Sequence, residues 1–326
     1  MGQKVILGCQ VFDFLGNMNR IYAIALNTFR EAVRDRILYG LLGFASAVLL
    51  FSLALAELSL NQQQRVVRDI GLASISLFSV LVAIFLGSSL LYKEIERKTL
   101  YIILPKPIHR YEFLLCKYFG ITLTGLVFVS IMGAIQFWVM AIQAGVAKHL
   151  IFGLPVALLA MLGIAMWRAR DRTAVLIPWS LLAVASAAWT FYQAAQSPLP
   201  VLAMLVLVIA EVMVLAAVAM VFSSFSTPFL TGVFTLGAWI VGRSAHEMAT
   251  MKSKVLAPSL RTLLRYLAEV VPNFSLYVPG YRTLSLNTED GAGPLTYVAS
   301  TLGYTVLYAT LLLALAALIF RRRDFL

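Results

Sequence analysis

Charged side chains are scarce in this chain. Asp, Glu, Lys and Arg together make up only 13% of its 326 residues, whereas 61% are hydrophobic. Soluble domains carry about 25% charged residues on average, so this composition excludes an ordinary soluble protein. Several apolar runs approach or exceed the ~20 residues that a helix needs to cross a bilayer. The sequence therefore predicts an all-α polytopic membrane protein, with residues 1–326 forming a single transmembrane domain.

Residues that bind metals or form disulfides are also few. The chain has only three His and two Cys. Cys9 and Cys116 both fall in segments that we assign to the cytoplasmic side, so we expect no disulfide. His246-Glu247 begins like the zinc-protease pattern H-E-x-x-H, but Thr250 occupies the position of the second ligand. We therefore expect no catalytic residue and no metal site.

The sequence also lacks a phosphate-binding loop. The pattern G-x-x-x-x-G-K-[ST], whose backbone cradles nucleotide phosphates, does not occur, so we expect this chain to bind no cofactor. The net charge of +11 does not indicate nucleic-acid binding, because Lys and Arg in membrane proteins gather on the cytoplasmic side. The composition therefore predicts the lipid bilayer as a partner and no nucleic acid.

Eight apolar runs are predicted to be spans. In chain order they cover residues 37–57, 70–92, 114–143, 150–167, 174–192, 201–222, 229–241 and 298–320. Eight spans place both termini on one side of the membrane. With the termini in the cytoplasm, the inner segments hold seventeen Lys or Arg (five before the first span, six in 93–117, three in 168–172 and three in 321–323) and the outer segments nine. This asymmetry favours cytoplasmic termini. Residues 150–192 form either two full spans or one re-entrant hairpin.

Two segments outside the spans have amphipathic helical patterns. Residues 20–36 place apolar side chains on one face and mostly charged ones on the other, which is typical of a helix that lies in the headgroup plane. An ordinary packed helix is the alternative. The charged candidates on this interfacial helix are Arg20, Arg30, Glu31 and Arg34. The long segment 243–297 is predicted to be an external loop with amphipathic helices folded onto the outer membrane surface, including an apolar patch at 274–278.

The longest polar interruption on the predicted cytoplasmic side covers residues 93–117. A plain connector between membrane helices needs only a few polar residues and a turn. This segment holds six Lys or Arg and three Glu, alternating with apolar residues. One interpretation is a short helix pressed against a partner; the other is a solvated loop whose positive charge only sets the topology.

Glu211 stands near the middle of an otherwise apolar predicted span. A carboxylate there costs about 2.5–3.5 kcal/mol on insertion scales, so it should face the bundle interior or a cavity. Its functional interpretation is a residue of the substrate path or the dimer interface. Its structural interpretation is a hydrogen bond to a neighbouring helix, and the sequence does not separate the two.

The motifs of the chain, taken in order, resemble those of ABC transporter permeases of the ABC-2 type. The segments that carry the resemblance are 26–35 (LNTFREAVRD), 94–100 (EIERKTL), 104–107 (LPKP), 110–113 (RYEF), 222–228 (FSSFSTP) and 321–325 (RRRDF). It covers the chain to about residue 143 and again from about 201. Residues 144–200 depart from it, because the usual core has six spans and this chain inserts a helical pair.

The resemblance implies an exporter permease that forms the translocation pathway as a homo- or heterodimer. A separate ABC ATPase subunit would bind ATP and Mg²⁺, and the protein would lie in a bacterial cytoplasmic (inner) membrane. Segment 93–113 would be the cytoplasmic coupling segment. Its candidate residues are Glu94, Glu96, Arg97, Lys98, Thr99, Pro105, Lys106, Pro107, His109, Arg110, Tyr111 and Glu112. The alternative is a secondary active transporter without an ATPase, for which inverted repeats and several intramembrane charges would be expected.

Overall fold

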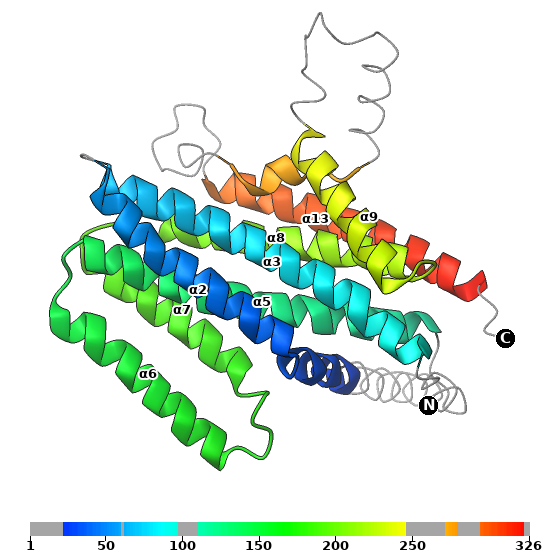
Figure 1. Ribbon diagram of the computed structural model, residues 1–326, viewed down its shortest axis with the longest axis horizontal. Coiled ribbons are helices and arrows are strands. Elements are labelled where there is room, and N and C mark those ends of the chain that lie inside the picture. Colours follow the sequence, from blue (N-terminus) through cyan, green and yellow to red (C-terminus); the bar gives the residue numbers. More distant parts are fainter. Residues whose placement is uncertain (1–21, 60–61, 97–109, 246–270, 280–293, 323–326) are drawn as a thin grey trace, which may run out of the picture.

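The structure is a computed structural model that describes residues 22–59, 62–96, 110–245, 271–279 and 294–322. Within these ranges every regular element is a helix, as the sequence predicts. The labelled elements are α2 (Arg36–Glu57), α3 (Gln63–Glu96), α5 (Arg110–Gln143), α6 (Lys148–Arg168), α7 (Leu176–Tyr192), α8 (Leu199–Ser223), α9 (Pro228–Arg243), the short 3-10 helix η1 (Phe274–Tyr277) and α13 (Pro294–Arg322) (Figure 1). A further helical stretch over residues 22–33 precedes α2.

A helix lies at each of the eight positions predicted to be spans, but the helices differ in how well they fit a bilayer. Among the described residues, six helices are long and apolar enough to cross: α2, α3, α5, α6, α8 and α13. The helix α7 is apolar but has 17 residues, and α9 has 16. At 1.5 Å per residue α9 is about 24 Å long, which is shorter than a hydrocarbon core of ~30 Å. The chain is thus a multi-pass membrane protein, and the total of eight spans stays a prediction.

Three helices form the centre of the bundle. The apolar windows of α3, α5 and α8 are 67%, 72% and 67% buried, whereas those of α2, α6 and α13 are only 17%, 11% and 22% buried. The poorly buried helices present large apolar side chains at their surfaces, such as Phe51 on α2, Trp167 on α6 and Leu307 on α13. Because lipid tails are as apolar as these side chains, such surfaces suit contact with a bilayer.

Small residues allow the central helices to approach closely. A Cβ atom added to Gly87 on α3 would collide with the Cβ of Ala219 on α8. A Cβ added to Gly125 on α5 would lie 2.5 Å from a methyl of Val212, also on α8. Helix association in lipid depends on van der Waals packing rather than on the hydrophobic effect, so these contacts stabilise the three-helix centre.

The bundle has two distinct ends. We call the end where α3 ends at Glu96 and α5 begins at Arg110 the connector end, and the end where α3 begins at Gln63 the far end. Figure 1 shows the connector end on the right, where α13 also ends and where the stretch 22–33 (dark blue) lies. The first and last described parts of the chain therefore lie toward the same end, the arrangement that the prediction of termini on one side requires.

Two aromatic residues of segment 243–297 are more deeply buried than the sequence predicts. Phe274 and Tyr277 of η1, which we expected in an apolar patch on the outer membrane surface, are 0% and 1% exposed and pack with residues of α3 and α8. The short helix α9 ends at Arg243, and a Cβ at Gly242 would collide with the carbonyl oxygen of Pro272. The chain at 271–279 thus packs directly against the end of α9, and its aromatic rings are covered by protein.

Candidate functional site

The structure places only part of the predicted coupling segment. Glu94 and Glu96 belong to the last turns of α3, and Arg110, Tyr111 and Glu112 form the start of α5. The other candidates lie outside the described residues: Arg97, Lys98, Thr99, Pro105, Lys106, Pro107 and His109. The two helices that flank this segment have 34 residues each, or about 51 Å, so both are much longer than a bilayer core of ~30 Å. Residues 97–109 therefore join two helices that extend beyond the membrane.

The predicted interfacial helix packs against α5. Its residues Leu26, Phe29 and Val33 are buried in a cluster with Val127 of α5. Gly120 makes this close packing possible, because a Cβ at that position would lie 2.9 Å from the carbonyl oxygen of Ala25. The apolar face that the sequence predicts is real over residues 22–33, but protein covers much of it. The alternative of an ordinary packed helix thus describes this face better than a helix on lipid alone.

Two ion pairs connect the polar face of this helix to neighbouring elements. Glu31 Oε2 lies 3.7 Å from Lys117 Nζ, and the Lys117 side chain on α5 is only 2% exposed. Arg30 Nη2 lies 2.9 Å from Asp171 Oδ2, in the turn between α6 and α7. Of the other two candidates, Arg34 is exposed and Arg20 lies outside the described residues. The stretch 22–33 therefore connects the beginning of α5 with the 168–172 turn at one end of the bundle.

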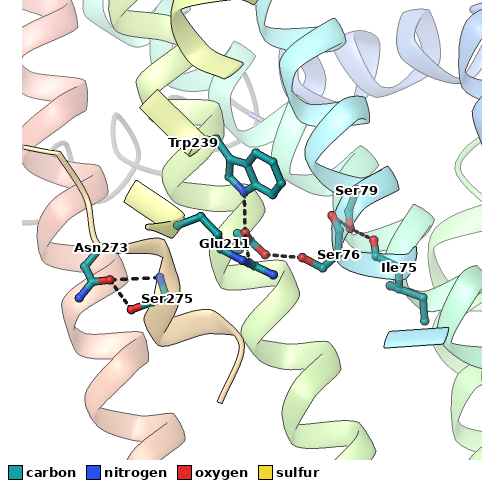
Figure 2. Close-up of polar contacts among 8 residues, drawn as sticks. Ile75, Ser76, Ser79, Glu211, Trp239, Asn273 and Ser275 are labelled. Atoms are coloured by element: carbon teal, nitrogen blue, oxygen red, sulfur yellow. Dashed lines mark hydrogen bonds and ion pairs between the residues drawn. The ribbon is translucent and has the colours of Figure 1, made fainter. Parts of the chain in front are cut away.

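Glu211 is the centre of a second polar cluster, inside the bundle. Its side chain is 0% exposed and accepts hydrogen bonds from three residues on two helices. Ser76 Oγ of α3 donates to Oε2 at 2.9 Å, and Trp239 Nε1 of α9 donates to Oε1 at 2.8 Å. Arg243 Nη1 forms an ion pair with the same Oε1 at 3.0 Å. Figure 2 shows Ser76 and Trp239 directed at the Glu211 carboxylate from different sides. This cluster joins α3, α8 and α9 through one carboxylate.

The ionic partner of Glu211 was missed in the sequence. Arg243 follows the predicted span 229–241, and we assigned it to the start of the external segment. Because α9 runs from the connector end and ends at Arg243, this guanidinium lies at the depth of a carboxylate in the middle of α8. Its centre is also 5.7 Å from the Trp239 ring, which adds a cation–π contact. The only feature of the sequence that could have pointed to this ion pair was the shortness of the predicted seventh span.

The residues around η1 are held to α13 by hydrogen bonds. Tyr277 Oη and Thr305 Oγ1 are 2.9 Å apart, and the backbone N–H of Asn273 donates to Tyr304 Oη at 3.1 Å. Asn273 Oδ1 also accepts from the Ser275 amide and hydroxyl (Figure 2). Segment 271–279 is thus a fixed part of the helix bundle.

These features do not form a catalytic or metal centre. In the described ranges, no group of three or more His, Cys, Asp or Glu is arranged to hold a metal ion. Charged side chains instead connect helices, at the connector end and around Glu211. Together with six described helices that are long and apolar enough to cross a membrane, this defines an integral membrane protein whose ion pairs connect its helices.

Comparison with known proteins identifies the family. The model of the family described as "ABC-2 family transporter protein" matches residues 22–325, so the chain belongs to the ABC-2 transporter family. A search of curated proteins finds no match. The resemblance drawn from the sequence motifs is confirmed, and the matched range also runs across residues 144–200. The protein is a permease component of an ABC transporter and not an enzyme by itself, which disfavours the alternative of a secondary transporter.

Proposed function

We propose that this chain is the exporter permease that couples a separate ATPase to a translocation pathway formed by two permease subunits. Members of the ABC-2 family generally work with an ATPase partner and as dimers. On this proposal, ATP and Mg²⁺ bind to the partner subunit, and segment 93–113 is the contact through which that subunit acts. The membrane in question would be a bacterial cytoplasmic membrane, with the connector end facing the cytoplasm.

The observation that supports this proposal best is the position of residues 97–109 between two helices of the central core. The helices α3 and α5 flank this segment and run through the whole bundle. A force applied to the segment therefore acts directly on two of the three central helices. The ion pair between Glu31 and Lys117 and the packing of Phe29 attach the stretch 22–33 to α5 at the same end. A shift of α5 would thus also displace the stretch 22–33.

The helix α3 also reaches the Glu211 cluster. Twenty residues separate Glu96 from Ser76, which is about 30 Å along the helix axis. A shift of α3 at the connector end would change the distance between Ser76 and Glu211, and through Glu211 the position of α9. This gives the proposal a physical route from an ATPase contact to the middle of the membrane, along one rigid element.

The proposal can be tested by reversing two charges of the coupling segment. In the double variant Arg97→Glu, Arg110→Glu, acidic partners on the ATPase would meet like charges, which can cost several kcal/mol. We expect this variant to insert and fold normally but to lose its ATPase on purification and to stop stimulating ATP hydrolysis.

A matched control reverses two other positive charges at the same end of the bundle. Arg168→Glu, Arg170→Glu alters two exposed residues at the end of α6 and in the following turn and should keep the ATPase bound. Full complex formation and full ATPase stimulation in the Arg97/Arg110 variant would show that segment 93–113 only sets topology, and the proposal would be wrong.

A further inference from the structure

A cavity of about 550 Å³ lies toward the far end of the bundle, away from the coupling segment. It is bounded by the first turns of α3, by α8, and by the last residue of η1 with the two residues that follow it. Its volume falls within the range of ordinary small-molecule sites, which is ~300–1,000 Å³. None of the described candidates of the coupling segment or the interfacial helix lines it. It therefore needs an explanation of its own.

The charged side chains that line the cavity lie together at one end. Arg65 and Arg68 line it together with Asp69, the carboxylate that both guanidinium groups contact, at 3.6 and 3.2 Å. Among the described residues that line the cavity there are thus two cations and one anion. The Arg68 side chain is only 15% exposed, so its charge is largely withdrawn from bulk water. A partly desolvated guanidinium is a strong donor for a phosphate or carboxylate group.

The remainder of the cavity is mostly apolar. Leu72 and Ala73 continue along the same face of α3, and Met204 and Val208 face them from α8. From Leu72 to Ser76 this apolar part follows four residues of α3, which is about 6 Å, and the whole cavity from Arg65 to Ser76 follows about 16 Å. Residues 65–76 lie within residues 63–89 of α3, the stretch that is long and apolar enough to cross a membrane. A free inorganic anion would leave this apolar length unused, whereas a molecule with an acidic head and a hydrocarbon body would fill it.

We propose that this cavity binds an anionic amphiphile, with a phosphate or carboxylate head at Arg65 and Arg68 and an apolar chain between Leu72 and Val208. The inner limit of the site is Ser76, whose hydroxyl donates to Glu211. A bound chain therefore ends beside the cluster that joins α3, α8 and α9. Occupancy of the site and the arrangement of the three helices are linked through this one hydrogen bond.

The proposal can be tested by lipid binding to the purified permease without any ATPase, so that its outcome is independent of the coupling proposal. Native mass spectrometry of the delipidated protein would follow the retention of dioleoyl phosphatidylglycerol and of dioleoyl phosphatidylcholine, which has the same chains but a zwitterionic head. We expect the anionic lipid to bind on the order of tenfold more tightly, since a charge-assisted contact contributes roughly one such factor. Arg68→Gln should remove this preference.

Matched variants separate this cavity from the general lipid surface. Ala73→Trp fills the cavity from α3 and should abolish retention of the anionic lipid. Two control variants should leave retention of the anionic lipid unchanged. They are Val206→Trp, at an exposed position on α8 outside the cavity, and Lys148→Gln, an exposed charge at the same end of the bundle. Equal retention of the two lipids, loss of binding in the control variants, or full displacement by inorganic phosphate at the same head-group concentration would each overturn the proposal.

Discussion

Removing either partner of the pair Glu211–Arg243 should destabilise the bundle, and removing both should cost less than the sum of the two. The carboxylate is 0% exposed and accepts from Ser76, Trp239 and Arg243, whereas the Arg243 side chain is 29% exposed. Single hydrogen bonds inside membrane proteins contribute ~0.6 kcal/mol on average and up to ~1.7 kcal/mol. Loss of all three contacts in Glu211→Leu should therefore lower the free energy of unfolding by about 2–5 kcal/mol.

The other variants follow from the same geometry. Glu211→Gln keeps the shape and the bonds to Ser76 and Trp239 but loses the ion pair, so we expect a loss of about 1–2 kcal/mol. Arg243→Met leaves a fully buried carboxylate without its cation, which should cost about 3 kcal/mol or more. In the double variant Glu211→Leu, Arg243→Met no buried charge is left without its partner. The double variant should therefore be at least as stable as the worse single variant.

The assay is urea- or heat-induced unfolding in detergent micelles, followed by circular dichroism, for the four proteins and the unmodified chain. Two positions in direct contact should deviate from additivity by more than the ~0.3–0.5 kcal/mol that is usual for independent sites. If Glu211→Leu and Arg243→Met each changed stability by less than 0.5 kcal/mol, roughly the additivity error, and their effects simply summed, the cluster would not join the three helices as described.

Two further predictions concern topology and packing. Arg170→Cys, in an exposed turn, should react with a membrane-impermeant thiol reagent only from the cytoplasmic side; labelling from outside in intact cells would refute cytoplasmic termini. Gly87→Leu should destabilise the chain by about 1–3 kcal/mol through overpacking against Ala219, whereas Gly43→Leu, with no atom within 4 Å of its added Cβ, should be nearly neutral; equal effects at both positions would contradict the close packing of α3 on α8.

The helices themselves could be predicted from the sequence because continuous apolar runs are a strong signal. The contacts that each helix makes were less predictable. The helical spacing of apolar residues in 20–36 correctly predicts an apolar face over the described part. This spacing does not show whether the face lies on lipid or on another helix. The face packs on α5, where Gly120 allows the stretch 22–33 to approach closely. The same limit explains Phe274 and Tyr277, because an apolar patch has the same pattern on a membrane surface as inside a bundle.

The Glu211 cluster shows a different limit. The carboxylate stands out in an apolar run, so its burial could be expected from the cost of exposing it to lipid. Its partner Arg243 could not be found in this way, because it sits at the end of a short helix beside a long polar segment. Only the depth at which α9 ends brings the guanidinium to the carboxylate, and that depth depends on tertiary packing.

The central claim, that segment 93–113 is the contact with an ATPase subunit, is tested most directly by site-specific photocrosslinking in intact membranes. A photoreactive residue at position 106 should crosslink to the ATPase subunit in high yield, whereas the same residue at position 148, at the far end of the bundle, should not. Crosslinking from position 106 that reaches only lipid or no protein, while the ATPase still co-purifies with the permease, would contradict the account.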